Sequence, residues 1–157
     1  MAGKMNKDER LKIDAHDVAI INELIENPKT PLRELGKKLR ISFVTALNRI
    51  KRLEKGGIIR QYTTKVDYEK LGYGTHALIQ VRISKGRFGE FSKMILKEPS
   101  IYAAYDITGE FDSAIIGHFK STQSMDKFLK RFQSYDFVER TYTALILHTI
   151  KENPMAV

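Results

Sequence analysis

The side chains best suited to chemistry in this sequence follow Ser42, over residues 43–55. When these residues are placed about 100° apart around a helix axis, Ala46, Ile50 and Leu53 gather on one side. The opposite side combines basic, amide and small apolar groups. The major groove of DNA accepts this mixture, because Asn pairs with adenine, Arg with guanine, and apolar groups contact thymine methyls. We expect DNA contacts from Ser42, Val44, Thr45, Asn48, Arg49, Lys51 and Arg52.

The charge of the surrounding residues also points to a polyanion. Between Arg33 and Arg60 the chain carries nine basic and two acidic residues, a local net charge of +7. Such a field attracts phosphate backbones and gives an affinity that falls as the salt concentration rises. An ordinary surface helix whose basic face contacts only water shows the same pattern. The neighbouring elements therefore have to distinguish the two interpretations.

Two further helices are predicted before this segment. Apolar residues recur at helical spacing after Asp14, a capping residue, until Pro28, which disfavours the α conformation in the residue before it. Thr30 and Pro31 then predict the start of a second helix, with the threonine hydroxyl as N-cap. This second helix is short and is expected to end near Arg40.

The third helix follows after a turn of only a few residues. Ser42 is its expected N-cap, and Gly56-Gly57 is expected to end it after Lys55. A short helix, a tight turn and a longer basic helix have the spacing of a helix-turn-helix. This context favours DNA over a merely solvated face. Residues 58–64 alternate weakly and predict a short strand or wing.

The rest of the chain predicts a second, α+β module. Alternating apolar residues indicate four strands, over residues 75–84, 101–107, 112–119 and 138–150. Apolar stripes between them indicate two helices. The resulting order, βαββαβ, is that of a ferredoxin-like domain, a four-stranded antiparallel sheet with both helices on one face.

The other face of this sheet must either pack against another surface or be exposed to solvent. Pairing of two chains through it is the simplest way to cover it. In the predicted register its residues form a semi-polar set, and a slip of one residue would present their alternates instead. The predicted set is Gln80, Arg82, Tyr102, Ala104, His118, Arg140, Tyr142 and Ala144.

The chain is therefore expected to contain four parts. These are a flexible basic arm (1–12), a helix-turn-helix DNA-binding domain (13–64), a linker (65–74) and a ferredoxin-like effector-binding and oligomerisation domain (75–157). No apolar run approaches the roughly 18 residues that span a membrane, and the first residues lack the apolar core of a signal peptide. We expect a cytoplasmic protein without a membrane partner.

Nothing in the sequence predicts catalysis, a metal or a cofactor. The absence of cysteine excludes disulfides, thiolate metal sites and cysteine nucleophiles. The four histidines are scattered one per predicted element, without the i, i+4 spacing of a helical metal pair. Gly56-Gly57 lacks the lysine and serine of a phosphate-binding loop. We therefore expect a protein that is not an enzyme.

Several motifs taken together resemble the Lrp/AsnC regulators, also called feast/famine regulatory proteins. The matching segments are residues 13–17 (Ile-Asp-x-x-Asp), 42–59, Leu71-Gly72, 108–112 (Thr-Gly-x-Phe-Asp) and 138–143. Their order and spacing span nearly the whole chain. The resemblance implies a winged helix-turn-helix, a βαββαβ effector domain, dimers that pair through their sheets, and octamers or other assemblies of those dimers on double-stranded DNA.

The same resemblance implies a small effector, often an amino acid, bound between dimers near the turn that joins the second and third strands. Backbone amides of that turn suit a carboxylate, and Glu110 or Asp112 suits an ammonium group. Gly109 and Asp112 are equally consistent with a tight hairpin alone. The implied effector-binding residues are Thr108, Gly109, Glu110 and Asp112, with Thr141 and Thr143 lining the same contact.

The sequence departs from the family pattern at two places. Gly36 stands where the second helix usually has alanine, which costs up to about 1 kcal/mol of helix stability. Phe43, Val44 and Leu47 make the third helix bulkier or more apolar than usual, so the operator cannot be copied from relatives. A competing interpretation is a small-molecule-binding or assembly protein whose helical head contacts protein instead of DNA.

Overall fold

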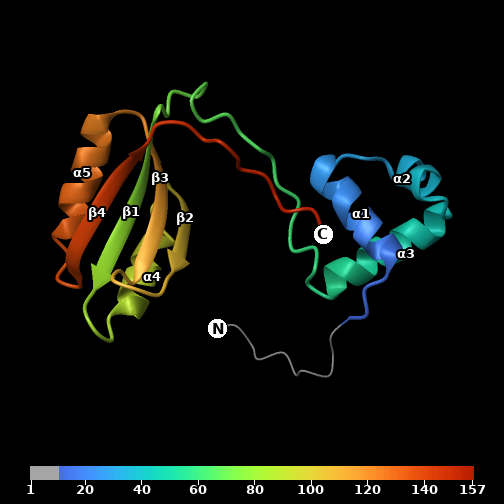
Figure 1. The fold of residues 1–157 in the computed structure, drawn as a ribbon, viewed down its shortest axis with the longest axis horizontal. Coiled ribbons are helices and arrows are strands. Elements are labelled where there is room, and N and C mark those ends of the chain that lie inside the picture. Colours follow the sequence, from blue (N-terminus) through green and yellow to red (C-terminus); the bar gives the residue numbers. More distant parts are fainter. Residues whose placement is uncertain (1–10) are drawn as a thin grey trace. The chain divides into compact units, whose positions relative to one another are not determined.

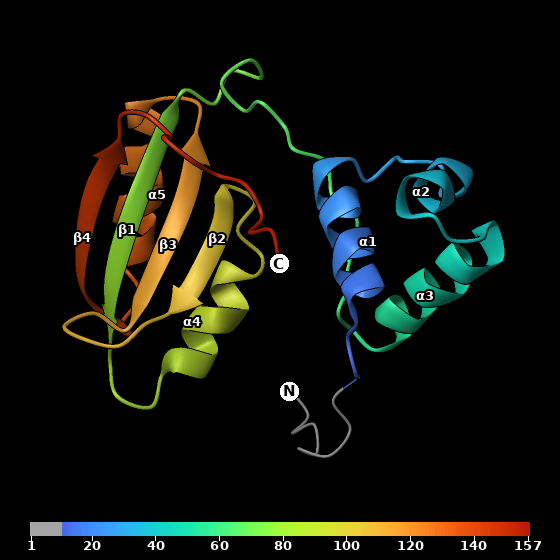
Figure 2. The ribbon, with the colours of Figure 1, turned by 45° about the vertical axis from the view of Figure 1, so that its right-hand side comes forward.

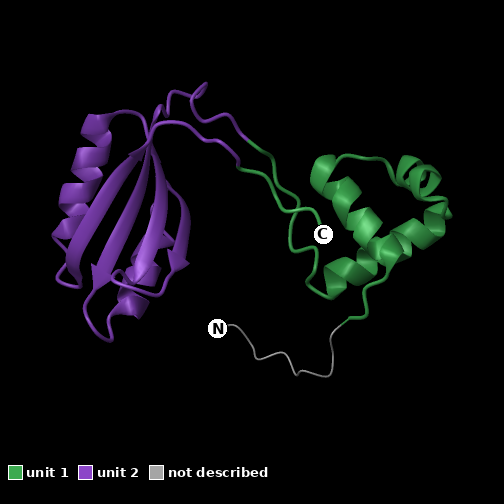
Figure 3. Ribbon diagram, in the orientation of Figure 1, with its two compact units in different colours: residues 1–65, 152–157 green, residues 66–151 purple. Residues whose placement is uncertain are grey.

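The computed structural model describes residues 11–157; the predicted basic arm therefore lies outside the described residues up to position 10. The chain forms two compact units, the first reaching to Lys65 and including Glu152–Val157, the second comprising Val66–Lys151 (Figure 3). Residues 152–157 thus belong with the first unit. From the sequence alone, they are expected in the domain that contains the sheet. Their contacts explain the difference, because Lys65 Nζ donates to Glu152 O at 2.7 Å.

Three helices make up the first unit: α1 (Ala15–Glu26), α2 (Leu32–Leu39) and α3 (Phe43–Lys55) (Figure 1). Its core contains one or more apolar residues from each helix: Ile20, Leu35, Ala46, Ile50 and Leu53. Leu11 packs against this core, so the residue assigned to a flexible arm belongs to the folded unit. The predicted helices and their buried stripe are confirmed.

Side-chain caps fix the starts of α1 and α3 but not that of α2. Asp14 caps α1 through its side chain, which accepts a hydrogen bond from Asp17 N at 3.0 Å. The predicted N-cap role of Thr30 is wrong, since Pro31 precedes α2 without a side-chain cap. The hydroxyl of Thr30 instead donates to the carboxylate of Glu23 at 3.1 Å. A hydrogen bond to a charged acceptor is stronger than one to a backbone amide, which accounts for the difference.

The turn between α2 and α3 explains Gly36. Ile41 N donates to Gly36 O at 2.9 Å, folding the chain back over the end of α2. A Cβ atom added at Gly36 would lie 2.8 Å from Ile41 O, closer than real contacts of this kind allow. The glycine is therefore required by the close approach of the turn.

The segment after α3 differs from its prediction. Gly57 has a φ of 68° and donates to Glu54 O, while Ile58 N donates to Leu53 O, so α3 ends in a Schellman motif. Residues 58–64, expected to form a strand or wing, form no strand. A strand requires a neighbour for its backbone groups, and the described part of the first unit offers no other strand.

The second unit has the predicted order βαββαβ. Its elements are β1 (Thr75–Ile83), α4 (Phe88–Ile95), β2 (Ile101–Asp106), β3 (Ser113–Phe119), α5 (Thr122–Gln133) and β4 (Val138–Ile146). The strands lie in the order β2-β3-β1-β4 and pair antiparallel. Both helices cover one face of the sheet (Figure 2). The last strand ends at Ile146, before the predicted residue 150, because its partner β1 begins at Thr75.

The face without helices carries most of the residues predicted for it. Tyr102 and Tyr142 are more than half exposed there. Ala104 is an exception, because an irregularity between Ile101 and Ala103 shifts the register. Ala104 pairs with Ile115, whose side chain is buried beneath the helices. The bulge thus turns this alanine to the covered face.

Candidate DNA-binding surface and effector site

The N-terminus of α3 is held by a pair of hydroxyl groups. Ser42 Oγ accepts a hydrogen bond from Thr45 N at 3.0 Å and lies 2.8 Å from Thr45 Oγ1. Both residues are exposed. Val44 in the same turn and Asn48 in the next are exposed as well, so the first two turns of α3 present hydroxyl, amide and methyl groups together.

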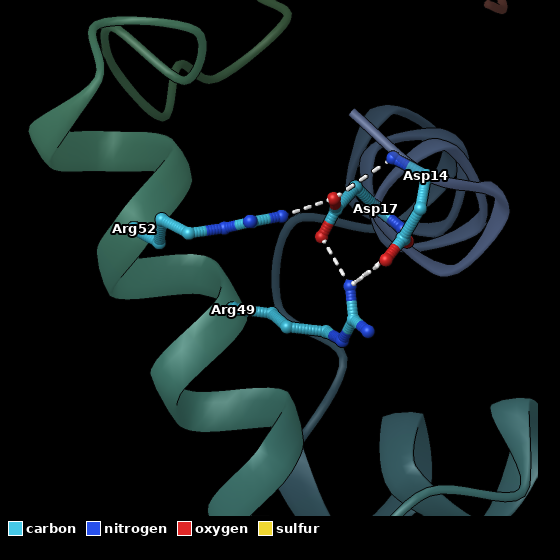
Figure 4. Close-up of polar contacts among 4 residues, drawn as sticks. All are labelled: Asp14, Asp17, Arg49 and Arg52. Atoms are coloured by element: carbon cyan, nitrogen blue, oxygen red, sulfur yellow. Dashed lines mark hydrogen bonds and ion pairs between the residues drawn. The ribbon is translucent and has the colours of Figure 1, made fainter. Parts of the chain in front are cut away.

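Both arginines that were predicted to contact DNA point back to α1. Arg49 Nη1 donates to Asp14 Oδ2 at 2.7 Å and to Asp17 Oδ1 at 2.8 Å, and Arg52 Nη2 is paired with Asp17 Oδ2 (Figure 4). The side chain of Asp17 is fully buried, whereas that of Arg49 is 24% exposed and that of Arg52 is 42% exposed. The four residues form an ion-pair network, the Asp14/Asp17–Arg49/Arg52 network, that ties α3 to the start of α1.

This network shifts the acids toward their charged forms. The Arg49 side chain, which is hydrogen-bonded to Asp14, lowers the pKa of that carboxyl to about 2. Burial acts to raise the pKa of Asp17, but the hydrogen bonds from Asp14 N, Arg49 and Arg52 outweigh it and hold the pKa below its usual value. Both carboxylates are therefore ionised at neutral pH, as their arginine partners require.

The structure thus sorts the seven predicted DNA contacts into two groups. Arg49 and Arg52 form ion pairs inside the unit, with Arg52 still 42% exposed, while Ser42, Val44, Thr45, Asn48 and Lys51 are exposed outside that network. Sequence reasoning recognised Asp14 as a cap but missed the role of Asp17. The signal was present in the matching spacing, because Asp14 and Asp17, like Arg49 and Arg52, lie three residues apart on one helix face.

The turn between β2 and β3 is built around Gly109 and Asp112. Gly109 has a φ of 119°, a conformation that side chains other than glycine rarely adopt. Asp112 Oδ2 accepts from Ile83 N at 2.8 Å, and Asp112 N donates to Val81 O at 2.9 Å. Asp112 therefore attaches the turn to β1, which is the hairpin role that the sequence left open.

Charged side chains surround a hollow beside this turn. Arg82, Gly109, Glu110, Glu139 and Arg140 line an open cavity of about 550 Å³. Arg82 Nη1 donates to Glu110 O at 2.9 Å, and Arg140 Nη2 is paired with the Glu110 carboxylate. The hollow therefore offers two guanidinium and two carboxylate groups around a glycine turn.

The two predicted threonines do not join this hollow within one chain. Thr141 pairs with Val81 and Thr143 with Ile79, so both lie on the helix-covered side of β4. Thr141 Oγ1 accepts from Gln133 Nε2 at 2.6 Å. The single chain thus separates the six predicted effector residues into the turn and the strand β4.

Among residues 11–157, the structure shows no helix long and apolar enough to cross a membrane. It also shows no cluster of three or more metal-ligating side chains within that range.

Comparison with known families agrees with both units. A family described as Lrp/AsnC ligand binding domain matches residues 76–156, and one described as winged helix-turn-helix DNA-binding matches residues 13–60. The chain belongs to the Lrp/AsnC family. It is accordingly a transcriptional regulator with a helix-turn-helix DNA-binding domain and a ligand-binding domain, and the family is one of regulators, not of enzymes.

Relatives from Pyrococcus match over nearly their full length. An uncharacterised HTH-type transcriptional regulator of Pyrococcus furiosus is 38% identical over 143 residues, covering 91% of this chain and 97% of that protein. A second relative, an HTH-type transcriptional regulator of Pyrococcus horikoshii, is 34% identical over 143 residues, covering 91% and 95%.

Solved Lrp/AsnC structures have the same fold. A transcriptional regulator of Neisseria meningitidis, solved in complex with L-Met, has a TM-score of 0.88 at 27% identity, covering 93% of this chain and 96% of that one. LrpC of B. subtilis has a TM-score of 0.84 at 29% identity, covering 90% and 99%. These structures support the α+β architecture deduced from the sequence.

Proposed function

We propose that this regulator binds double-stranded DNA sequence-specifically through the exposed side of α3. The observation that carries the proposal is that different side chains of α3 contact α1 and solvent. Arg49 and Arg52 hold the helix against α1, which leaves Asn48, Thr45 and Val44 exposed for base edges. Lys51 is exposed as well and suits a phosphate.

A titration of DNA affinity against salt tests this proposal. Affinity for the protein's own promoter is expected to fall steeply between 50 and 200 mM salt, on the order of tenfold or more. Asn48→Ala is expected to relax preference for one base position at a cost of about 1–3 kcal/mol. If the affinity for DNA does not change with salt concentration and is the same for Asn48→Ala, the competing function is favoured, in which the helical unit contacts another protein.

The uncovered sheet face supports pairing of two chains. It exposes Tyr102, Tyr105 and Tyr142, each more than half exposed, on a sheet whose other side is filled by α4 and α5. Aromatic side chains are enriched in the buried centres of protein interfaces. A dimer with two-fold symmetry would read a pseudo-palindromic site with half-sites about one helical turn apart, and assembly of dimers into octamers or other forms is part of the same proposal.

A small effector, such as an amino acid, is proposed to bind at the charged hollow beside Gly109. Arg82 and Arg140 suit a carboxylate, and Glu110 and Glu139 suit an ammonium group. The Neisseria meningitidis relative, solved with L-Met, supports this class of ligand. Thr141 and Thr143 would join the site only from a neighbouring dimer. No other cofactor and no catalytic step form part of the proposal.

Calorimetry with a panel of amino acids tests the effector site. Binding of at least one member is expected, and Glu110→Gln is expected to weaken it, whereas Glu69→Gln in the linker is a matched control. Asp112→Ala is a poorer probe, because this side chain also supports the turn. If no member releases heat, the second unit serves assembly alone. The regulator is further proposed to act in the cytoplasm, where its DNA partner is reached directly.

A further inference from the structure

A second hollow in the sheet unit lies far from the Gly109 turn. It has a volume of about 450 Å³, within the usual range of small-molecule sites. His118, Phe119 and Lys120 line it at the end of β3, whereas Gly109 precedes the start of that strand. With a rise of about 3.3 Å per residue, the length of β3 separates this hollow from the charged one.

Helix α5 supplies one wall of this hollow. Ser124, Lys127, Phe128 and Arg131 all line it, and their positions at i, i+3, i+4 and i+7 place them on one side of a helix. The first turn is held by a reciprocal cap, since Ser121 Oγ accepts from Ser124 N at 3.2 Å and Ser124 Oγ accepts from Ser121 N at 3.0 Å. The wall is therefore formed by a fixed part of the helix.

The inner surface of the hollow is aromatic. Phe119 and Phe128 are 3% and 5% exposed, and their ring centroids lie 5.4 Å apart. Tyr73 lies at the same hollow, with Lys120 Nζ 5.6 Å from its ring centroid. Because Phe119 and Phe128 are almost fully buried, the apolar surface that a ligand with an apolar ring or branch would cover is chiefly that of Tyr73 and Pro99, which also line the hollow.

Of the three basic side chains at the edge of the hollow, only Arg131 forms an ion pair with an acid among the described residues. Arg131 is paired with Glu98, which also accepts a hydrogen bond from Ser100 Oγ at 2.8 Å. Lys120 and Lys127 have no ion pair with any residue in the part of the chain that the structure describes, 11–157. Lys130, one turn from Lys127, is by contrast paired with Asp126 at 2.8 Å. The hollow therefore carries two ammonium groups, those of Lys120 and Lys127, that could pair with an anionic ligand.

We propose that this hollow binds a small organic anion with an apolar body. The carboxylate of the ligand lies between Lys120 and Lys127, and its apolar part packs against Tyr73 and Pro99 above the buried rings of Phe119 and Phe128. A neutral ligand would leave the two lysines unused, and a bare inorganic anion would leave the aromatic surface wet. The site goes beyond the proposed effector site at the Gly109 turn and does not depend on it.

Binding of phenylacetate, with phenylacetamide as its neutral counterpart, tests this proposal on the full chain. Titrations followed by amide NMR signals are expected to show shifts at Lys120, Ser124 and Lys127, with phenylacetamide at least about tenfold weaker because the charge-assisted hydrogen bonds are lost. The double variant Lys120→Gln/Lys127→Gln is expected to lose a similar factor. Lys93→Gln/Lys97→Gln, which makes the same charge change in α4 and the turn after it, outside the hollow, is expected to bind as the unaltered chain does.

Four outcomes would overturn the proposal. Equal affinity of the Lys120/Lys127 double variant and the unaltered chain would show that the lysines play no part. Inorganic phosphate binding as tightly as phenylacetate would remove the role of the aromatic surface. Signal shifts confined to residues 108–112, abolished by Glu110→Gln, would assign the anion to the proposed effector site. A double variant that weakens DNA binding while no small anion binds would make this surface a DNA contact.

Discussion

Arg49 on α3 donates a hydrogen bond of 2.8 Å to Asp17, an acid on α1 whose side chain is completely buried. The same nitrogen also donates to Asp14, the residue that caps α1. Arg49, which the sequence predicts to contact DNA, therefore joins α1 and α3 of the DNA-binding unit. A buried carboxylate without its cation is costly, so this pair is expected to matter for folding before it matters for DNA.

Replacement of Arg49 tests that expectation. Arg49→Ala leaves Asp17 with one arginine fewer, and loss of hydrogen bonds between charged groups is expected to lower the free energy of unfolding by about 2 kcal/mol. Lys51→Ala, an exposed neighbour on α3, is expected to change it by less than about 0.5 kcal/mol. Urea unfolding followed by amide signals of the first unit compares them, and coinciding midpoints would rule out a structural role for Arg49.

Acid is expected to destabilise the first unit through the same network. Because Arg49 holds the pKa of Asp14 at about 2 and that of Asp17 is also lowered, both carboxylates bind protons more weakly in the folded chain than in the unfolded one. Their contribution is complete above the unfolded pKa of about 4 and is lost as the pH falls toward 2. Urea midpoints measured from pH 7 to pH 2.5 should follow this course.

Asp14→Asn isolates the part of the acid effect that belongs to this network. Asparagine still caps a helix but cannot titrate. Its urea midpoint should change less between pH 4 and pH 2.5 than that of the unaltered chain. Equal slopes for the two chains would place the acid sensitivity of the first unit in other carboxylates, such as Glu23, whose pKa is also lowered, chiefly by the hydrogen-bonded Lys38 side chain.

Gly36→Ala should be destabilising although alanine favours helices. The added Cβ would lie 2.8 Å from Ile41 O, and relieving such an overlap costs about 1–3 kcal/mol. Gly89→Ala on α4, where a Cβ would meet nothing within 4 Å, should instead stabilise by up to about 1 kcal/mol. Thermal or urea unfolding of both variants gives opposite signs if the turn between α2 and α3 is as close as described.

A charge on the uncovered sheet face should weaken pairing of chains. Tyr142→Glu places an unpaired carboxylate at a side chain that is 58% exposed and lies opposite Gln80. Burying that charge in an interface should raise the dimer dissociation constant by at least about tenfold. Leu96→Glu, an 86% exposed residue at the end of α4, is the control. Sedimentation velocity that finds the same mass for both variants would exclude this face as the interface.

Local patterns were enough to predict most of the fold. The helical period over α3 identified Ala46, Ile50 and Leu53 as core, and the alternation in β1 identified Ala77, Ile79, Val81 and Ile83, all of which are buried. These signals are local because one side of each element faces the core. The order of strands and helices then left the ferredoxin-like arrangement as the natural solution.

What the sequence could not predict depends on contacts between distant residues. The pairing of Arg49 with Asp17 joins two helices, and neither residue alone indicates it. The bulge at Tyr102 reverses the side on which Ala104 lies, and a single shift in register is invisible in a short alternating run. Thr141 was assigned by resemblance to a contact between dimers, and no sequence pattern indicates that within one chain it accepts a hydrogen bond from Gln133.

The Asp14/Asp17–Arg49/Arg52 network has a thermodynamic consequence for how the regulator meets DNA. The entropy cost of ordering these four side chains is met when the chain folds, so the exposed side of α3, which we propose enters the DNA groove, is pre-organised. Docking of a pre-organised helix should show a small heat-capacity change that reflects the contact area alone, without the large negative value of a segment that folds as it binds. Because the ion pairs between α1 and α3 already fix the helix, the conformational entropy lost on DNA binding would be that of the contacting side chains alone.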